Sequence, residues 1–180
     1  MSNNGERLPV QPALAIFVGL PGAGKSTFYE NYLAKTHQLV SKDRLRNARH
    51  RDQRQLELVR LALAAGRDVV VDNTNPSLAD REALIALGKA LQATIVAYFF
   101  PPDIPASLAR NSQRQGKACV PVVAIMAKAK ILQPPTLLEG FDAVFTVQTL
   151  ERGQFSIDTG LGVTDHALPQ ATRDTVAPVP

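Results

Sequence analysis

The chain has 180 residues, 45% of them hydrophobic and 20% charged, and this composition is typical of one globular domain with a single core. Its formal net charge is +4, and no apolar run approaches the roughly 20 residues that a helix needs to span a bilayer, so no membrane partner is expected. Cys119 is the only cysteine, which excludes an internal disulfide and favours a reducing, cytoplasmic setting.

Short apolar runs alternate with helical patterns along the chain. Residues 1–12 are polar, without the apolar segment of a secretory signal, and are expected to form a loose leader. Apolar runs predict strands at Ala13–Val18, Leu39–Val40, Asp68–Val71, Thr94–Phe100 and Ala143–Val147. Helical spacing and turn residues predict intervening helices at Lys25–Lys35, Asp52–Ala65, Pro76–Leu91, Ile104–Gln113 and Val122–Ile131.

This alternation predicts an α/β fold with a doubly wound, mostly parallel five-stranded sheet and helices on both faces. One domain is expected over residues 13–150. Residues 151–180 hold few large apolar side chains after Leu161 and end in VAPVP. We therefore expect this segment to form an optional edge strand at Phe155–Ile157, followed by a disordered tail.

A glycine-rich segment between the first predicted strand and helix matches the phosphate-binding pattern G-x-x-x-x-G-K-[ST] in full. Glycine allows a tight turn that aims backbone N–H groups at phosphate oxygens, and the helix N-terminus adds partial positive charge. Lys25 would bind the β- and γ-phosphates of ATP, and the Ser26 hydroxyl would be a ligand of Mg²⁺. The expected nucleotide-binding residues of this loop are Gly19, Pro21, Gly22, Ala23, Gly24, Lys25, Ser26 and Thr27.

A charged cluster, Ser41-Lys42-Asp43-Arg44-Leu45-Arg46, follows the second predicted strand. The carboxyl ends of parallel strands meet at one edge of the sheet, so Asp43 is expected near the phosphate loop. There its carboxylate would accept the proton of an attacking hydroxyl. Arg46 lies three residues on, about one helical turn away, and would face the same pocket. A surface turn with an ordinary ion pair is the alternative.

The third predicted strand runs directly into Asp72-Asn73-Thr74-Asn75-Pro76. A carboxylate after such a strand commonly serves Mg²⁺, directly or through water. Asp72 is therefore a candidate residue of the metal site. A helix cap is the structural alternative, because Pro76 suits the first turn of a helix and Asn73 or Asn75 would fill the same capping role.

Another cluster contains two arginines. It is formed by Arg110-Asn111-Ser112-Gln113-Arg114 and the following Gly116-Lys117-Ala118-Cys119-Val120-Pro121. Arg110 and Arg114 are four residues apart on a predicted helix, so they are expected to project from one side. A mobile helical lid with two arginines would neutralise the γ-phosphate and exclude water during phosphoryl transfer. Solvated arginines on an ordinary helix surface are the alternative.

Basic residues are concentrated in two segments. Lys42–Arg54 contains six basic and two acidic residues, and Ile104–Leu138 contains five basic residues and no acid. The net charge is +6 over residues 1–150 and −2 over residues 151–180. Two basic segments are typical of a protein with a polyanionic partner, although two solvated helix faces would carry the same charges.

The segments at Ser41–Arg46, Val69–Pro76 and Arg110–Pro121 together resemble the kinase domain of the 5′-polynucleotide kinases, which occurs in phage end-healing enzymes and animal DNA-repair enzymes. The resemblance spans roughly Ala13–Val147 and implies a P-loop kinase domain with a helical lid over residues 13–150. It implies that Asp43 is the general base, and that Arg46 binds the phosphate of the acceptor strand. In the lid it implies that Arg114 contacts the phosphates of ATP, with a supporting role for Arg110.

The same resemblance assigns further residues. The family's D-N-T-N-P pattern lies on the acceptor side, which implies substrate-binding roles for Asp72, Asn73 and Thr74, and leaves the metal role of Asp72 open. The family often has arginine where this chain has Lys42, which keeps the charge but loses the planar fork. A stretch that ends in Glu139-Gly140-Phe141 resembles a family segment beside the nucleotide, although Phe141 would equally suit the core.

The resemblance implies transfer of the γ-phosphate of ATP, with Mg²⁺, to the 5′-hydroxyl of a single-stranded or end-exposed nucleic acid. The chain has no D-x-D phosphatase motif, so a phosphatase or ligase would be a separate partner. The alternative is a P-loop kinase that acts on a small-molecule hydroxyl, such as a sugar, a nucleoside, an antibiotic or a cell-wall precursor. Arg46 and its basic neighbours discriminate between the two, since a neutral acceptor does not need them.

Overall fold

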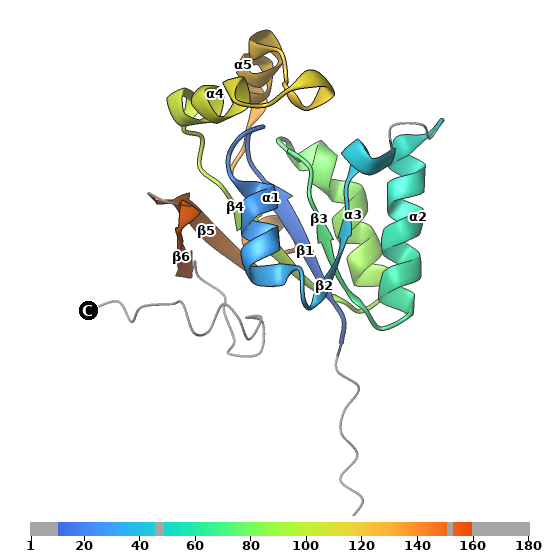
Figure 1. The fold of residues 1–180 in the computed structure, drawn as a ribbon. Coiled ribbons are helices and arrows are strands. Elements are labelled where there is room, and N and C mark those ends of the chain that lie inside the picture. Colours follow the sequence, from blue (N-terminus) through green and yellow to red (C-terminus); the bar gives the residue numbers. More distant parts are fainter. Residues whose placement is uncertain (1–10, 46–48, 151–152, 160–180) are drawn as a thin grey trace, which may run out of the picture.

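The structure is a computed structural model that describes residues 11–45, 49–150 and 153–159, and its core is a single β-sheet flanked by helices (Figure 1). The strands are β1 (Ala13–Val18), β2 (His37–Val40), β3 (Asp68–Val71), β4 (Thr94–Phe99), β5 (Ala143–Thr149) and β6 (Phe155–Thr159). Their order is β2-β3-β1-β4-β5-β6, with β1 to β5 parallel and β6 antiparallel to β5. The predicted α/β fold with a mostly parallel sheet is confirmed, and the optional edge strand is β6.

The five predicted helices are present in order, and each begins and ends within two residues of its predicted position. The helical segments are α1 (Lys25–Phe28) with its π-helical continuation η1 (Tyr29–Leu33), the 3₁₀ turn η2 (Lys42–Leu45), α2 (Arg51–Ala64), α3 (Leu78–Ala90), α4 (Ile104–Ser112), the 3₁₀ turn η3 (Gly116–Ala118), α5 (Val122–Ile131) and the 3₁₀ turn η4 (Leu137–Glu139). Helix α3 begins two residues after Pro76, because Ser77 and Asp80 form a capping box in place of Asn73 or Asn75. In the described part of the chain, no helix is both long and apolar enough to cross a membrane.

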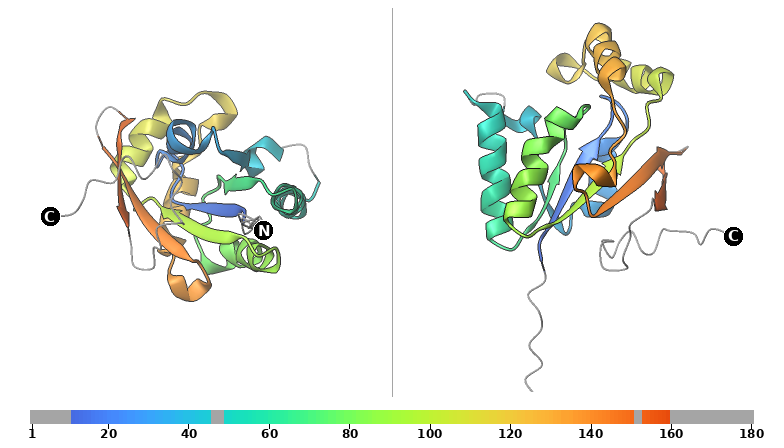
Figure 2. Two further views of the ribbon diagram at one scale, coloured as in Figure 1. Left: turned by 90° about the horizontal axis from the view of Figure 1, so that it is seen from below. Right: turned by 180° about the vertical axis from the view of Figure 1, so that it is seen from behind.

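Side chains of β1 alternate between two apolar cores, one on each face of the sheet. Leu14, Ile16 and Val18 pack with α2 and α3, whereas Ala15 and Phe17 pack with α1 and η1. All five are completely buried. Helix α1 lies in front of the sheet in Figure 1, and α2 and α3 come forward in the view from behind in Figure 2. A strand covered on both faces has to be apolar throughout, which explains the unbroken apolar run after Pro12.

Helices α4 and α5 lie beyond the carboxyl ends of the parallel strands, as the predicted lid requires (Figures 1 and 2). The loop between them is closed by Asn111, whose side chain is only 3% exposed. Its Nδ2 donates to the carbonyl oxygen of Val120 at 2.7 Å, and its Oδ1 accepts from the backbone N–H of Val120 at 2.9 Å. The backbone N–H of Arg114 donates to the Asn111 carbonyl at 3.1 Å. These hydrogen bonds give the loop that carries Arg114 a defined conformation.

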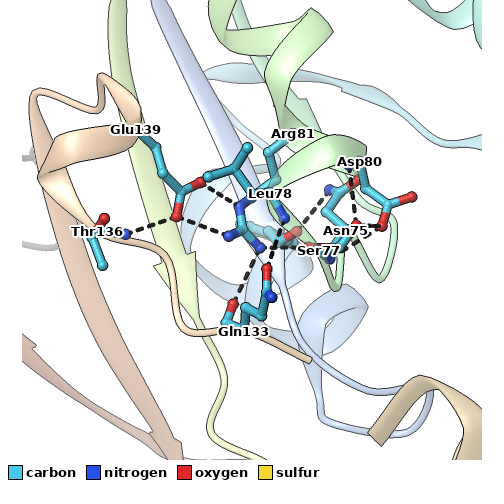
Figure 3. Close-up of polar contacts among 9 residues, drawn as sticks. Asn75, Ser77, Leu78, Asp80, Arg81, Gln133, Thr136 and Glu139 are labelled. Carbon is cyan, nitrogen blue, oxygen red and sulfur yellow. Dashed lines mark hydrogen bonds and ion pairs between the residues drawn. The ribbon is translucent and has the colours of Figure 1, made fainter. Parts of the chain in front are cut away.

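A buried ion pair joins the end of the lid to the rest of the domain (Figure 3). Arg81 is completely buried, and its Nε and Nη2 donate to the two carboxylate oxygens of Glu139 at 2.7 and 2.8 Å. Its Nη1 donates to the carbonyl oxygens of Asn75 at 3.0 Å and Gln133 at 3.2 Å. The guanidinium charge is therefore paired and hydrogen-bonded, as burial demands. Phe141, two residues beyond the paired glutamate, is confirmed as a core residue, at 5% exposure.

Candidate functional site

The phosphate loop connects β1 to α1, as predicted, and two of its glycines are required by geometry. Gly22 has a φ of +80°, and a Cβ at this position would lie 2.6 Å from the carbonyl oxygen of Ser107 on α4. Gly24 has a φ of +92° and is the N-cap of α1. A residue with a side chain would be strained at both positions. The loop therefore packs directly against the first lid helix.

Many of the residues predicted in the phosphate loop and in the three charged or polar clusters line one cavity of about 390 Å³. Lys25 of the phosphate loop, Asp43 of η2 and Arg114 of the lid loop all contribute to it. Other predicted residues that line the same cavity are Pro21, Gly22, Gly24, Ser26, Asp72, Asn73 and Thr74. A phosphate-binding loop, a carboxylate and a lid arginine thus share one space, which is the arrangement that transfer between two bound substrates requires.

Ser26 and Asp72 are adjacent in this cavity. The Ser26 hydroxyl donates to Oδ2 of Asp72 at 2.7 Å. Ser26 lies at the start of α1 and Asp72 directly follows β3, which pairs with β1 in the sheet. A hydroxyl oxygen beside a carboxylate oxygen is a donor set that suits Mg²⁺. Because Ser77 caps α3, the interpretation of Asp72 as a helix cap is wrong.

Asn73 and Thr74 hold the loop after β3 in place. The Asn73 Oδ1 accepts from the backbone N–H of Lys42 at 3.0 Å, and its Nδ2 donates to the Gln55 side chain on α2 at 2.9 Å. The Thr74 carbonyl oxygen accepts from the backbone N–H of Gly19 at 3.0 Å. This loop is therefore tied to η2 on one side and to the phosphate loop on the other.

The two lid arginines line different cavities, so the prediction that they project from one side is wrong. Helix α4 ends at Ser112, before Arg114, and the helical spacing no longer applies across the pair. Arg114 lines the cavity that contains Lys25. Arg110 stays on α4, where its Nε donates to the carbonyl oxygen of Gly22 at 2.5 Å, and it lines a second cavity of about 270 Å³.

This second cavity adjoins the phosphate loop at Ala23 and was not predicted from the sequence. Pro102, Gln148 and Thr149 contribute to its wall, and the Thr149 hydroxyl donates to the Ala23 carbonyl oxygen at 3.2 Å. These residues follow or end β4 and β5 at the carboxyl edge of the sheet. Their position at that edge was the available signal, since ligands of open α/β sheets bind there.

Lys25 is a buried cation, 7% exposed, whose Nζ donates to two loop carbonyl oxygens at 3.1 and 2.7 Å. Burial lowers the pKa of Lys25 from 10.5 to about 8. Asp72 and Asp43 act to raise this pKa, and Arg114 acts to lower it further. The charges of three predicted site residues therefore all act on one amine, which agrees with their shared cavity.

The lowered pKa of Lys25 predicts that nucleotide binding takes up protons in mildly alkaline solution. Phosphate charges beside the amine raise its pKa, so an amine that is partly neutral above about pH 8 becomes protonated in the complex. ADP affinity is therefore expected to fall as the pH rises through this range. Titration calorimetry at about pH 8.5, in two buffers with different ionisation enthalpies, measures the uptake. Equal heats in both buffers, or the same uptake by Lys25→Met, would contradict the assignment.

The remaining predicted residues take varied positions. Thr27 is exposed on α1, and Gly19 contributes its N–H to the loop after β3. Arg46 lies outside the described residues. Sequence reasoning did not identify Asp80 and Lys128, which also line the cavity of Lys25. Both belong to helices whose patterns indicated only apolar faces and surface charge.

Comparison with known proteins places the chain in a family. Residues 14–135 match the family model AAA_33, described as an AAA domain. A protein of Acanthamoeba polyphaga mimivirus, whose name describes a bifunctional polynucleotide phosphatase/kinase, is 30% identical over 82 residues, which are 45% of this chain and 18% of that protein. A chain in the structure of the Pnkp1/Rnl/Hen1 RNA repair complex is 25% identical, with a TM-score of 0.59, over 71% of this chain and 46% of that chain.

A gluconokinase from Sinorhizobium meliloti 1021 has the same fold, with a TM-score of 0.59 and 18% identity over 92% of this chain and 94% of that chain. The chain spans less than half the length of the mimivirus protein and of the matched chain in the RNA repair complex. The resemblance to polynucleotide kinases that the motifs indicate is confirmed by these two relatives. Because the family model matches more than half of its residues, the chain belongs to the AAA domain family AAA_33, as a P-loop kinase domain.

Proposed function

We propose that this chain transfers the γ-phosphate of ATP to the 5′-hydroxyl end of a DNA or RNA strand. The observation that carries the proposal is the convergence of Lys25, Asp43, Asp72 and Arg114 on one cavity of about 390 Å³. A nucleotide-binding protein that only switches or only binds nucleic acid does not need a carboxylate base, a phosphate loop and a lid arginine in one space.

The phosphate loop is proposed to hold the phosphates of ATP in the larger cavity. The second cavity, lined by Arg110 and Pro102, adjoins the same loop at Ala23 and is proposed to hold the nucleoside part. The hydroxyl of Ser26 and the carboxylate of Asp72, 2.7 Å apart, fit Mg²⁺ as a pair of hard oxygen donors. When bound, Mg²⁺ would neutralise charge on the phosphate oxygens.

Asp43 is proposed to orient the 5′-hydroxyl and accept its proton. The hydroxyl oxygen forms the new bond to the γ-phosphorus while the bond from phosphorus to the ADP oxygen breaks, and ADP leaves with that electron pair. Lys25 of the phosphate loop and Arg114 of the lid loop neutralise the charge on the transferring group. The lid helices exclude water, which would otherwise compete with the acceptor.

Asn73 and Thr74 are proposed to shape the acceptor side through their backbone and side-chain bonds to η2 and the phosphate loop. Arg46 is proposed to bind a phosphate of the acceptor strand. The names of the mimivirus protein and of the RNA repair complex support a nucleic-acid acceptor. The presence of the second relative in an RNA repair complex also supports a phosphatase or ligase as a partner.

A panel of acceptors tests this function. Purified protein is incubated with radiolabelled ATP, Mg²⁺ and either 5′-hydroxyl DNA or RNA oligonucleotides, nucleosides, gluconate or other sugars. Label is expected on the oligonucleotide 5′ ends and on no neutral acceptor. The fold shared with the gluconokinase makes a small-molecule kinase the competing candidate. Label on a sugar with none on any oligonucleotide would replace the proposed function with that candidate.

A further inference from the structure

Two lysines and an aspartate line the larger cavity on the side that faces helices α2 and α3. Lys42, Asp80 and Lys128 belong to this cavity, and Lys42 and Asp80 also line a neighbouring cavity of about 240 Å³ between α2 and α3. The two spaces are therefore adjacent at Lys42 and Asp80. A strand that passed from the larger to the smaller one would leave over the first turn of α3, away from the phosphate loop.

The Arg81 network fixes this side of the cavity. Gln133 follows lid helix α5, and its backbone N–H donates to the Pro76 carbonyl oxygen at 2.7 Å. Its carbonyl oxygen accepts from Arg81 at 3.2 Å, and its side-chain oxygen accepts from the backbone N–H of Leu78 at 3.2 Å. Figure 3 shows Arg81 turned toward Gln133 and Glu139, while the neighbouring Asp80 turns to the other side. The end of α5 is thus anchored on the first turn of α3.

This anchor places Lys128, in the last turn of α5, in the same cavity as Asp80. Desolvation acts to raise the pKa of Asp80, but hydrogen bonds from Ser77 and the charges of Lys128 and Lys42 hold it below its ordinary value. Two ammonium groups from segments about 86 residues apart therefore act on one carboxylate. Asp80 is itself committed to the cap of α3 through Ser77.

Lys42 has a second partner that a ligand can displace. Its Nζ lies 2.5 Å from Oδ1 of Asp52, whose side chain is 80% exposed. Exposed ion pairs of this kind contribute little free energy, so the pair opens easily when a stronger anion arrives. Across the cavity, Lys128 belongs to the lid segment Ile104–Leu138, which has no acidic residue at all. Because the Asp80 carboxylate already accepts hydrogen bonds from Ser77 in the cap of α3, both ammonium groups are available to an anion that enters this space.

We propose that Lys128 and Lys42 bind a phosphodiester of the acceptor strand on the 3′ side of the reacting hydroxyl, and that the strand leaves the cavity over α3. This inference rests on the proposed function. A phosphodiester supplies the anionic oxygens that two ammonium groups bind, whereas a neutral sugar supplies none. Because Lys128 belongs to the lid, strand binding at this position also stabilises the lid above the acceptor.

Strand binding by charge variants tests the proposal. A 3′-fluorescein-labelled 5′-hydroxyl oligonucleotide of about ten nucleotides is titrated, by anisotropy, at several salt concentrations. Lys128→Ala is expected to weaken binding by about tenfold, and to reduce the slope of log affinity against log salt by about 0.7, the value for one lost single-strand phosphate contact. Lys130→Ala, two residues on and exposed, is the matched control and should bind as the wild type does. Lys128→Arg should restore the slope.

Asp52→Asn gives an expectation of opposite sign, because loss of this carboxylate frees Lys42 for the strand, and binding should tighten. The KM for ATP should stay unchanged in all four variants. The inference would be overturned if Lys128→Ala bound the strand with the affinity and salt slope of the wild type, or if Lys128→Ala and Lys130→Ala lost the same affinity. Either result would leave the proposed function standing as long as the wild type phosphorylates oligonucleotides. Failure of the wild type to phosphorylate any oligonucleotide would overturn the function itself.

Discussion

Replacement of Asp43 by alanine is expected to lower the rate of phosphoryl transfer by a factor of about 10²–10⁴ and to leave nucleotide affinity nearly unchanged. Asp43 lines the cavity of Lys25 and Arg114, on a turn held by the bond from the Lys42 N–H to the Asn73 side chain. Its carboxylate is the proposed acceptor of the hydroxyl proton, whereas the phosphate loop is the proposed binding site of the nucleotide phosphates. Single-turnover transfer to a 5′-hydroxyl oligonucleotide, together with calorimetric ADP binding, separates the two effects.

Asp72→Ala is the matched control for this experiment, because Asp72 lies in the same cavity but beside Ser26. Its loss is expected to raise the Mg²⁺ concentration needed for half-maximal rate, and excess Mg²⁺ should recover part of the activity. No concentration of Mg²⁺ should rescue Asp43→Ala. If instead Asp43→Ala responded to Mg²⁺ and Asp72→Ala did not, the two aspartates would exchange their assigned roles.

The parts of this protein that could be predicted from sequence are those that local spacing determines. The unbroken apolar run before Gly19 predicts a strand buried on both faces, and the structure has β1 there between two cores. The phosphate loop pattern predicts glycine where the backbone turns tightly, and Gly22 and Gly24 adopt positive φ angles there. Asp43 and Asp72 follow neighbouring parallel strands, so the topology of the sheet alone brings them near the loop.

Contacts that depend on long-range pairing could not be predicted. Arg81 and Glu139 are 58 residues apart, and no sequence motif indicates that they form an ion pair. Within a helical pattern, an arginine is expected on a solvated face, yet Arg81 is completely buried because a carboxylate and two carbonyl oxygens satisfy its guanidinium. The position of Lys128 in the same cavity as Asp80 was equally inaccessible to sequence reasoning, because the end of α5 is held on α3 through Gln133.

The lid shows how one side chain overrides helical periodicity. A spacing of four residues places Arg110 and Arg114 on one face only while the helix continues. Asn111 ends that continuity, since its amide bonds both backbone groups of Val120 and closes the chain into a loop. The capping box at Ser77 is a different case, because the S-x-x-D spacing was present in the sequence and the nearby proline suggested an earlier start.

Replacement of Lys25 by methionine is expected to reduce kcat/KM for ATP by a factor of about 10²–10³, the usual cost of removing one preorganised charge from a transferring phosphoryl group. Methionine has nearly the volume of the lysine stem, so the buried position, 7% exposed, is filled without a cavity. The measurement is steady-state transfer at saturating oligonucleotide with varied ATP. Near-normal turnover would contradict the assignment of the phosphate loop.

The same substitution separates loss of function from loss of structure. Burial depresses the pKa of Lys25 to about 8, so the folded protein disfavours the ammonium form relative to the unfolded chain. At neutral pH the amine is nevertheless protonated in both states, and the folded state bears the cost of the buried charge. Methionine removes that cost and also two hydrogen bonds to loop carbonyl oxygens. The melting temperature of the nucleotide-free variant is therefore expected to equal or exceed that of the wild type, and a marked decrease would attribute the lost activity to unfolding instead.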